Sequence, residues 1–310
     1  MAAALAAALA YAAPAGANGR FPASNAIVFA PNDPKLVVVR VTFGLLVSRD
    51  AGESWSWVCE RAITPSGAIV GATFEGVAVS RDGGCSWAFA GGEGKNALVD
   101  VAMRPDGTLV GIASTYDRTI DGGSLYKNKV VVSRDDARSF EAVGAALDPS
   151  LLLESVEVAP SDPKRIYLTA VRGEGKTRTG VFLVSEDDAR TWKEHPLALA
   201  PGELAVYLGP VDPRRPGRAY LRTSGAPEAD TRLLVTDDAG KTFREALKVK
   251  GPMNGLAITP DGARVFAGGR EAGVFTAAAD ALAFEKTSGV EVSCLGATAD
   301  VLWACSSERS

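Results

Sequence analysis

The stretch Ser185–Trp192, which reads SEDDARTW, decides the fold because close copies of it recur along the chain. The copies are SRDAGESW at 48–55, SRDGGCSW at 80–87, SRDDARSF at 133–140 and TDDAGKTF at 236–243. Their shared pattern is Ser/Thr-x-Asp-x-Gly/Ala-x-Ser/Thr-aromatic, and we call each copy a box. A short apolar run precedes each box, and an extended stretch follows most of them. The pattern therefore predicts that each box is the turn of a β-hairpin.

The residue types of a box suit a tight turn. An Asp carboxylate accepts backbone N–H groups, a Gly supplies positive φ, and the aromatic residue starts the next strand as an apolar wedge. Ala137 and Ala189 stand where Gly is expected, so those two turns should be slightly strained or of another type. The structural residues predicted from the boxes are Asp50, Trp55, Asp82, Trp87, Asp135, Phe140, Asp187, Trp192, Asp238 and Phe243.

A second repeated turn, rich in Pro and Asp, precedes each box. It occurs as PNDPK at 31–35, TPSG at 64–67, RPDG at 104–107, PSDPK at 160–164, VDPRR at 211–215 and TPDG at 259–262. Together the two turns divide the chain into units of four strands, each an antiparallel meander. Six units fit, at about 26–58, 61–90, 97–143, 152–195, 203–247 and 253–287, the last with a degenerate box.

Glu291–Cys305 resembles the start of a seventh unit. Four-stranded sheets repeated around an axis make a β-propeller. We therefore predict an all-β fold, with a single propeller domain over 18–310 that has six recognisable blades and a partial seventh. The last sheet would be completed by chain beyond the given sequence, or by a strand from residues 18–24 that closes the ring and covers an exposed edge.

The boxes resemble the Asp-box (BNR) repeats of sialidases, the sortilin propeller, xyloglucan-degrading glycosidases and photosystem assembly factors of the Ycf48 type. The resemblance covers most of residues 26–287 and implies a propeller fold. In these families the box is a structural turn that lies away from the active face. The resemblance therefore supports the fold and leaves the function to be argued from the site itself.

Composition and the amino terminus bound the cellular role. The 310-residue chain carries 33 Lys and Arg against 37 Asp and Glu, so it lacks the basic excess that nucleic-acid binding needs. Residues 1–13 are nearly all Ala and Leu, and a small-x-small pattern follows at 15–17. We predict a signal peptide over 1–17 and a secreted or periplasmic location, the alternative being a disordered Ala-rich tail. The apolar run is too short to span a membrane, so no transmembrane segment is expected after cleavage.

Meander topology places the Pro/Asp turns and the boxes on one face of the ring, which we call the box face. The loops between second and third strands lie on the other face, the loop face, and they are long at 114–129, 172–180 and 223–232. Loops on a rigid scaffold often carry binding, so we predict a site there for a glycan or protein partner. The alternative is solvated hairpins without a ligand. The candidate binding residues are Tyr116, Asp117, Arg118, Tyr126, Arg172, Glu174, Arg178, Arg222, Glu228 and Arg232.

The sequence favours a non-catalytic binding or assembly module, with a sialidase-like glycoside hydrolase as the alternative. Sialidase chemistry would need arginines for a substrate carboxylate and a Tyr activated by a Glu. The string at 19–22, GRFP, departs from the Phe/Tyr-Arg-Ile-Pro motif, and no Tyr–Glu pair is evident. A paired-carboxylate mechanism would need two acids about 5–9 Å apart. The acids available for it are Glu75, Asp117, Glu174 and Glu228.

No cofactor and no metal site are expected. The box carboxylates come one to a turn, which is a poor cage for calcium, and the single histidine, His195, is interpreted as a surface residue. Cys294 and Cys305 flank a predicted turn and would lie opposite each other, so we predict a disulfide between them. Cys59 and Cys85 are then the second pair by elimination.

Overall fold

The computed structural model describes residues 24–30, 33–41, 44–54, 56–58, 62–73, 75–83, 86–120, 123–226 and 229–305. Several sequence predictions fall outside these residues and keep the status of predictions. They are the signal peptide at 1–17, residues 18–23 of the predicted closing strand, the box residue Trp55, the Cys59–Cys85 pair and the candidate binding residue Glu228.

The regular structure of the described residues is almost entirely antiparallel β-sheet, as predicted. The first sheet contains β1 (Ser24–Ala30), β2 (Asp33–Val41), β3 (Gly44–Ser48) and β4 (Ser56–Val58). The second contains β5 (Ala62–Ile63), β6 (Ile69–Thr73), β7 (Gly76–Ser80) and β8 (Ala88–Phe89). The third contains β10 (Asp100–Met103), β11 (Leu109–Ile120), β12 (Gly123–Ser133), β13 (Ser139–Val143) and the added β9 (Gly91–Gly92).

The remaining sheets follow in chain order. The fourth contains β14 (Leu151–Ala159), β15 (Asp162–Arg172), β16 (Thr179–Ser185) and β17 (Lys193–Leu197). The fifth contains β18 (Glu203–Val211), β19 (Ala219–Gly225), β20 (Asp230–Thr236) and β21 (Arg244–Lys250). The sixth contains β22 (Gly255–Ile258), β23 (Arg264–Gly269), β24 (Gly273–Ala278) and β25 (Glu285–Ser288), and the seventh is the hairpin of β26 (Cys294–Ala297) and β27 (Leu302–Cys305). Two short 3-10 turns, η1 (Glu93–Lys95) and η2 (Gly175–Thr177), lie between strands.

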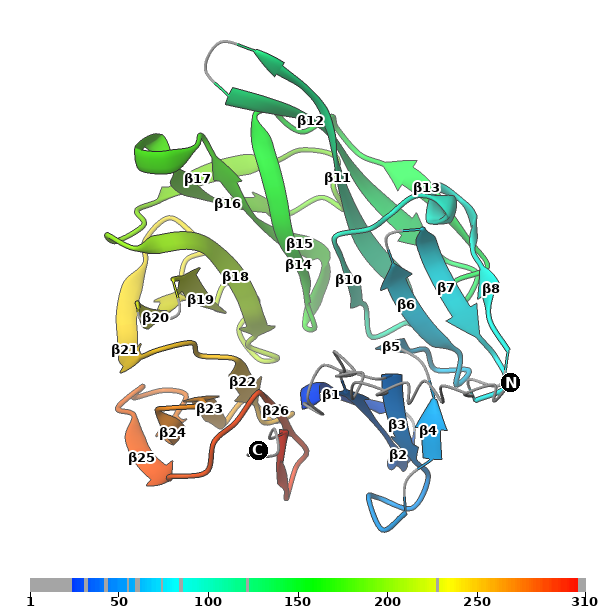
Figure 1. Ribbon diagram of the computed structural model, residues 1–310, viewed down its shortest axis with the longest axis vertical. Helices are drawn as coiled ribbons and strands as arrows, with labels where there is room; N and C mark the ends of the chain where they lie inside the picture. The colour runs from blue at the N-terminus through cyan, green and yellow to red at the C-terminus, as the bar shows by residue number, and fades with distance from the viewer. Residues whose placement is uncertain are drawn as a thin grey trace, which may run out of the picture.

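The sheets follow one another around a ring, with the first strand of each unit on the inside (Figure 1). Within every unit the strands pair in chain order, which is the predicted meander. The one departure is β9, which pairs in parallel with β13 and so ties the end of the second unit to the third sheet.

Apolar cores fill the spaces between successive sheets. The core between the third and fourth sheets contains Val130, Leu153, Ile166 and Leu168, all at most 2% exposed. The other junctions are filled in the same way, because each central strand presents apolar side chains to both of its neighbours. The ring is thus held by packing between sheets.

The two ends of the described chain meet. The β26–β27 hairpin packs against β1, and the rings of Phe29 and Trp303 lie 5.9 Å apart. Gly296 lets β26 approach β1 closely, because a Cβ there would lie 2.5 Å from Cγ2 of Ile27. Ser24 itself pairs with Val41 of β2, within the first sheet.

The disulfide predicted at the end of the chain is present. Cys294 and Cys305 occupy opposed positions on β26 and β27, with their Cα atoms 4.9 Å apart. Within the described residues, no helix is long and apolar enough to cross a membrane.

The boxes are hairpin turns organised by their aspartates. In the fourth sheet, Oδ1 of Asp187 accepts hydrogen bonds from the Thr191 N–H at 2.9 Å and the Ser185 hydroxyl at 2.9 Å. Its Oδ2 accepts the Thr191 hydroxyl at 2.6 Å, and these bonds, those of Thr191 above all, lower the pKa of Asp187 to about 2. Asp50, Asp82, Asp135 and Asp238 are bound in the same way. Ala137 and Ala189 have φ of 60° and 64°, in the left-handed region that is costly for a residue with a Cβ, as the first of the two expectations for these turns requires.

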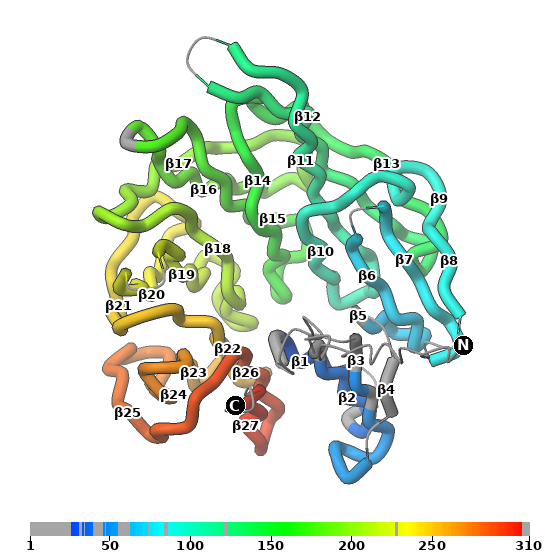
Figure 2. Tube along the Cα trace, viewed as in Figure 1, coloured from blue at the N-terminus to red at the C-terminus, as the bar shows by residue number. Residues whose placement is uncertain are grey.

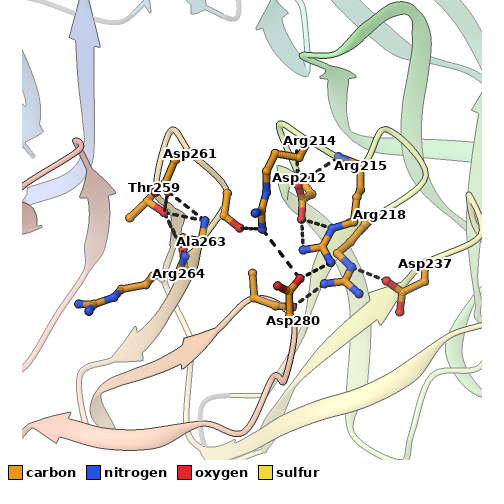
Figure 3. A network of polar contacts seen from close by, with 12 residues as sticks. Asp212, Arg214, Arg215, Arg218, Asp237, Thr259, Asp261, Ala263, Arg264 and Asp280 are labelled. Atoms are coloured by element: carbon orange, nitrogen blue, oxygen red, sulfur yellow. Dashed lines mark hydrogen bonds and ion pairs between the residues drawn. The ribbon is translucent and has the colours of Figure 1, made fainter.

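Arginine–aspartate pairs link neighbouring sheets on the box face (Figure 3). Arg218 pairs with Asp237 of its own sheet and donates to the Ala279 carbonyl of the sixth sheet. Arg215 pairs with Asp212 and, at 2.6 Å, with Asp280 of the sixth sheet. Similar pairs join Arg81 to Asp136 and Arg104 to Asp188. Many of the charged side chains on this face therefore form ion pairs that hold neighbouring sheets together.

Candidate functional site

The most prominent feature of the loop face is the long hairpin of β11 and β12, which extends beyond the other sheets (Figure 2). The outer part of the hairpin, beyond Ile112 and Val130 where the pairing with β10 and β13 ends, consists of β11 paired with β12. Its Tyr126 N–H donates to the Pro149 carbonyl at 2.8 Å. Tyr116 and Tyr126 lie opposite each other on this part, with their rings 6.4 Å apart in an edge-to-face arrangement. Such a pair stiffens a two-stranded ribbon.

A cleft of about 470 Å³ separates this hairpin from the fourth sheet. The hairpin contributes Ile120 and Tyr126, and the fourth sheet contributes Leu152 on β14. The loop between β15 and β16 closes the cleft with Glu174 and Arg178. We call this space the hairpin cleft. It lies at two of the three insertions that the sequence singled out.

Charged residues at the rim of the hairpin cleft are partly committed to each other. Glu174 accepts a 2.8 Å hydrogen bond from the Ser124 hydroxyl, which ties the hairpin tip to the fourth sheet. Arg172 lies between Asp148 and Glu194, at 2.8 and 2.9 Å, so its charge is already balanced. We therefore assign Arg172 a structural role in the lining of the cleft.

The other predicted residues of the hairpin do not line the cleft. Asp117 pairs with Arg118 at 2.5 Å and with Lys127 at 3.0 Å, and Lys127 is the main cause of the lowered pKa of the Asp117 carboxyl. One carboxylate of the hairpin thus pairs with two of its cations. Tyr116 is 57% exposed and Ile120 48% exposed, so the tip offers apolar surface beside the cleft.

The structure separates the two arginines predicted on the fifth sheet. Arg232 makes two short bonds to the carboxylate of Glu203, at 2.7 and 2.6 Å, and a third to the Ala198 carbonyl. The Glu203 side chain is only 2% exposed, so this is a buried structural pair. Arg222 instead lies over the ring of Tyr207 at 4.9 Å, on the inner strands of the sheet.

A polar cluster that sequence reasoning missed lies where the fourth and fifth sheets meet. Glu154 on β14 interacts with the hydroxyl of Tyr207 on β18, and Arg178 acts electrostatically on both. Burial raises the pKa of the Glu154 carboxyl and lowers that of the Arg222 guanidinium. We call Glu154, Arg178, Tyr207 and Arg222 the inner cluster. Arg178 belongs to both the inner cluster and the hairpin cleft, so the two adjoin.

Two further residues considered as catalytic lie elsewhere. Glu75 is exposed in the turn between β6 and β7, on a different sheet from the cleft. His195 lies on the outermost strand β17, opposite Phe182, and no nucleophile is bonded to it among the described residues. Within those residues, no group of three or more His, Cys, Asp or Glu could hold a metal ion.

Comparison of the whole chain with solved structures defines the fold. Hydrazine synthase from Kuenenia stuttgartiensis matches 94% of this chain and 96% of its own at a TM-score of 0.65 and 13% identity. The GH74 enzyme of Niastella koreensis matches 84% of this chain at a TM-score of 0.58 and 18% identity. The fold is a β-propeller. This propeller covers only 46% of the GH74 chain, and at such identities the likeness establishes the fold alone.

A weaker structural match is YCF48 bound to D1 peptide, with a TM-score of 0.49 and 17% identity over 79% of this chain and 74% of that chain. A scan against protein-family models finds no match. A search of curated protein sequences finds none either.

Proposed function

We propose that this propeller is a non-catalytic binding module that holds a protein partner in the hairpin cleft. The observation that carries the proposal is the cleft itself, about 470 Å³ between a projecting hairpin and the fourth sheet. A two-stranded hairpin forms one wall and the fourth sheet the other, and binding sites commonly form where loops project from such a scaffold. On the box face, in contrast, many charged side chains already form ion pairs between neighbouring sheets.

A protein partner fits the lining better than a glycan does. Ile120, Leu125, Leu152 and Val171 give the cleft an aliphatic surface, and Tyr126 is its one aromatic residue among the described ones. Exposed Tyr116 extends that surface beyond the rim. Apolar anchors surrounded by polar groups are typical of protein interfaces. A glycan remains the alternative ligand.

The same proposal includes export and membership of the Asp-box propellers. The Cys294–Cys305 disulfide is typical of proteins that fold in an oxidising compartment, which supports a secreted or periplasmic location. The common hydrogen-bond pattern of the five box aspartates supports the Asp-box assignment.

The proposal is tested by selecting peptides from a random display library on the wild-type protein, with a glycan array in parallel. Ile120→Glu should weaken binding of the selected peptides by at least about ten-fold, because it places a charge where an apolar anchor docks. The matched control is Val301→Glu, since Val301 is 49% exposed and lies on the distant β26–β27 turn. Equal losses in both variants, or glycan binding without peptide binding, would contradict a protein partner.

Glycoside hydrolysis is a second candidate, favoured by the contact between Glu154 and Tyr207 beside two arginines. A Tyr activated by a Glu, with Arg groups for a substrate carboxylate, is the arrangement that a sialidase-like mechanism requires. The hydroxyl of Tyr207 is, however, held by burial at a raised pKa, which disfavours the ionised nucleophile. Binding therefore stands first.

Hydrolysis is tested with fluorogenic sialosides and β-glucosides. If the inner cluster is catalytic, Tyr207→Phe should reduce turnover at least about 100-fold while leaving the fold intact, because it removes only the hydroxyl oxygen. We expect no turnover by the wild-type protein. Turnover that Tyr207→Phe abolishes would establish the enzyme in place of the binding module.

A further inference from the structure

Arg222 carries a guanidinium group without a counter-ion among the described residues. It extends from β19 over the face of Tyr207, and the described residues provide its guanidinium with neither a carboxylate nor a hydrogen-bond acceptor. The residue is partly exposed, so a ligand can reach it. Burial disfavours its charge, which lowers its pKa, and a desolvated charge without a counter-ion is costly. An anion bound beside the Arg222 guanidinium would offset this desolvation cost.

Arg178 is only partly satisfied by hydrogen bonds. One of its terminal nitrogens, Nη1, donates to the Leu204 carbonyl at 3.1 Å, while its Nε is buried without a partner among the described residues. Its charge lowers the pKa of both Glu154 and Tyr207, against the effect of burial. Arg178 also lines the hairpin cleft. A ligand in that cleft therefore meets one guanidinium group of the inner cluster directly.

The inner cluster carries an excess of positive charge. It contains two guanidinium groups and a single carboxyl, that of Glu154, whose pKa is raised by burial. Guanidinium groups bind carboxylates through paired, charge-assisted hydrogen bonds that are stronger than neutral ones. The chemistry of the cluster thus selects an anion, and its planar donors suit a carboxylate.

We propose that Arg178 and Arg222 form an anchoring site for a carboxylate of the protein segment that occupies the hairpin cleft. This inference rests on the proposed binding function and specifies the ligand's chemistry. The carboxylate comes from a chain terminus or from an acidic side chain. The aliphatic lining of the adjoining cleft favours a protein segment over an acidic sugar.

Side-chain NMR of the wild-type protein tests the site through the Nε–Hε signals of Arg178 and Arg222. The probes are N-acetyl-leucine for a chain terminus, N-acetylglutamate α-amide for an acidic side chain, and N-acetyl-leucinamide as the neutral match. Either or both carboxylates should shift the two signals saturably, and the neutral amide should not. N-acetylneuraminic acid supplies the acidic-sugar arm. Tighter binding of that sugar than of both peptide carboxylates would overturn the assignment to a protein segment.

Variants make the test specific. Arg222→Gln should weaken carboxylate binding at least about ten-fold, since it removes the charge and keeps a polar side chain. Arg264→Gln is the matched control, because Arg264 on β23 also lacks a side-chain partner among the described residues but lies on the box face (Figure 3). If Arg222→Gln fails to fold, Arg178→Gln and the NMR titration of the wild-type protein still show whether the site binds a carboxylate. Equal binding of the amide, or no effect of either arginine change, would refute the carboxylate site. Selected peptides that still depend on Ile120 would then leave the proposed function standing.

Discussion

Replacing Glu157 by Gln is expected to stabilise the propeller by up to about 5 kcal/mol at pH 8–9. Glu157 lies on the inner strand β14, next to Val156, whose N–H is bound by Asp100 of the neighbouring sheet at 3.0 Å. Burial, with repulsion from Asp100 as a second cause, raises the pKa of Glu157 to about 8. A glutamine keeps the shape of the side chain and removes the ionisation.

The raised pKa of Glu157 predicts that the wild-type protein becomes less stable as the pH rises. Because the folded-state pKa of about 8 lies above the unfolded-state value of about 4.3, the folded protein retains a proton that the unfolded chain releases. Stability is therefore unaffected by this group below about pH 4, falls as the pH rises toward 8, and levels off above it. Urea unfolding of wild type and Glu157→Gln at pH 4, 6, 8 and 9 measures the gap. Glu75→Gln, on an exposed turn, is the control. A constant gap across this range would contradict the assignment.

Replacing Arg232 by Met is expected to lower the free energy of unfolding by about 3–5 kcal/mol. The change leaves the Glu203 carboxylate, 2% exposed, without the two hydrogen bonds that now balance its charge. The double variant Glu203→Gln/Arg232→Met should recover much of the loss, because it removes the unpaired charge. Urea unfolding at pH 7 measures both variants.

The same variant separates a structural role from a binding role. The sequence placed Arg232 among the candidate ligand residues, and its bonds to Glu203 and Ala198 place it within the fold. Any loss of peptide binding in Arg232→Met should therefore follow its loss of stability. A stable Arg232→Met protein that no longer binds the selected peptides would restore the original interpretation.

The fold was predictable because its turns repeat. Each box concentrates side-chain hydrogen bonds around one Asp within eight residues, so local sequence is enough to locate the hairpin. The opposed positions of Cys294 and Cys305 followed from the short turn that the two residues flank. The parallel pairing of β9 with β13 could not be predicted, because β9 consists of two glycines and so leaves no side-chain pattern to recognise.

The candidate site was predictable only in outline. Meander topology located the loop face and insertion lengths selected three of its loops, and Tyr126, Glu174 and Arg178 do lie together at the hairpin cleft. Which arginines are committed to a partner depends on residues distant in sequence, such as Glu194 for Arg172. Glu154 and Tyr207 were missed for the same reason, since they meet only through the packing of two inner strands.

The most direct test of the central claim is photocrosslinking of a display-selected peptide to the propeller. A benzophenone amino acid is placed at Tyr116 on the hairpin, and in a control protein at Phe89 on β8, which are 57% and 54% exposed. Binding in the hairpin cleft predicts a covalent peptide adduct at position 116 and none at position 89. Crosslinking at position 89 alone, or equally at both positions, would contradict it.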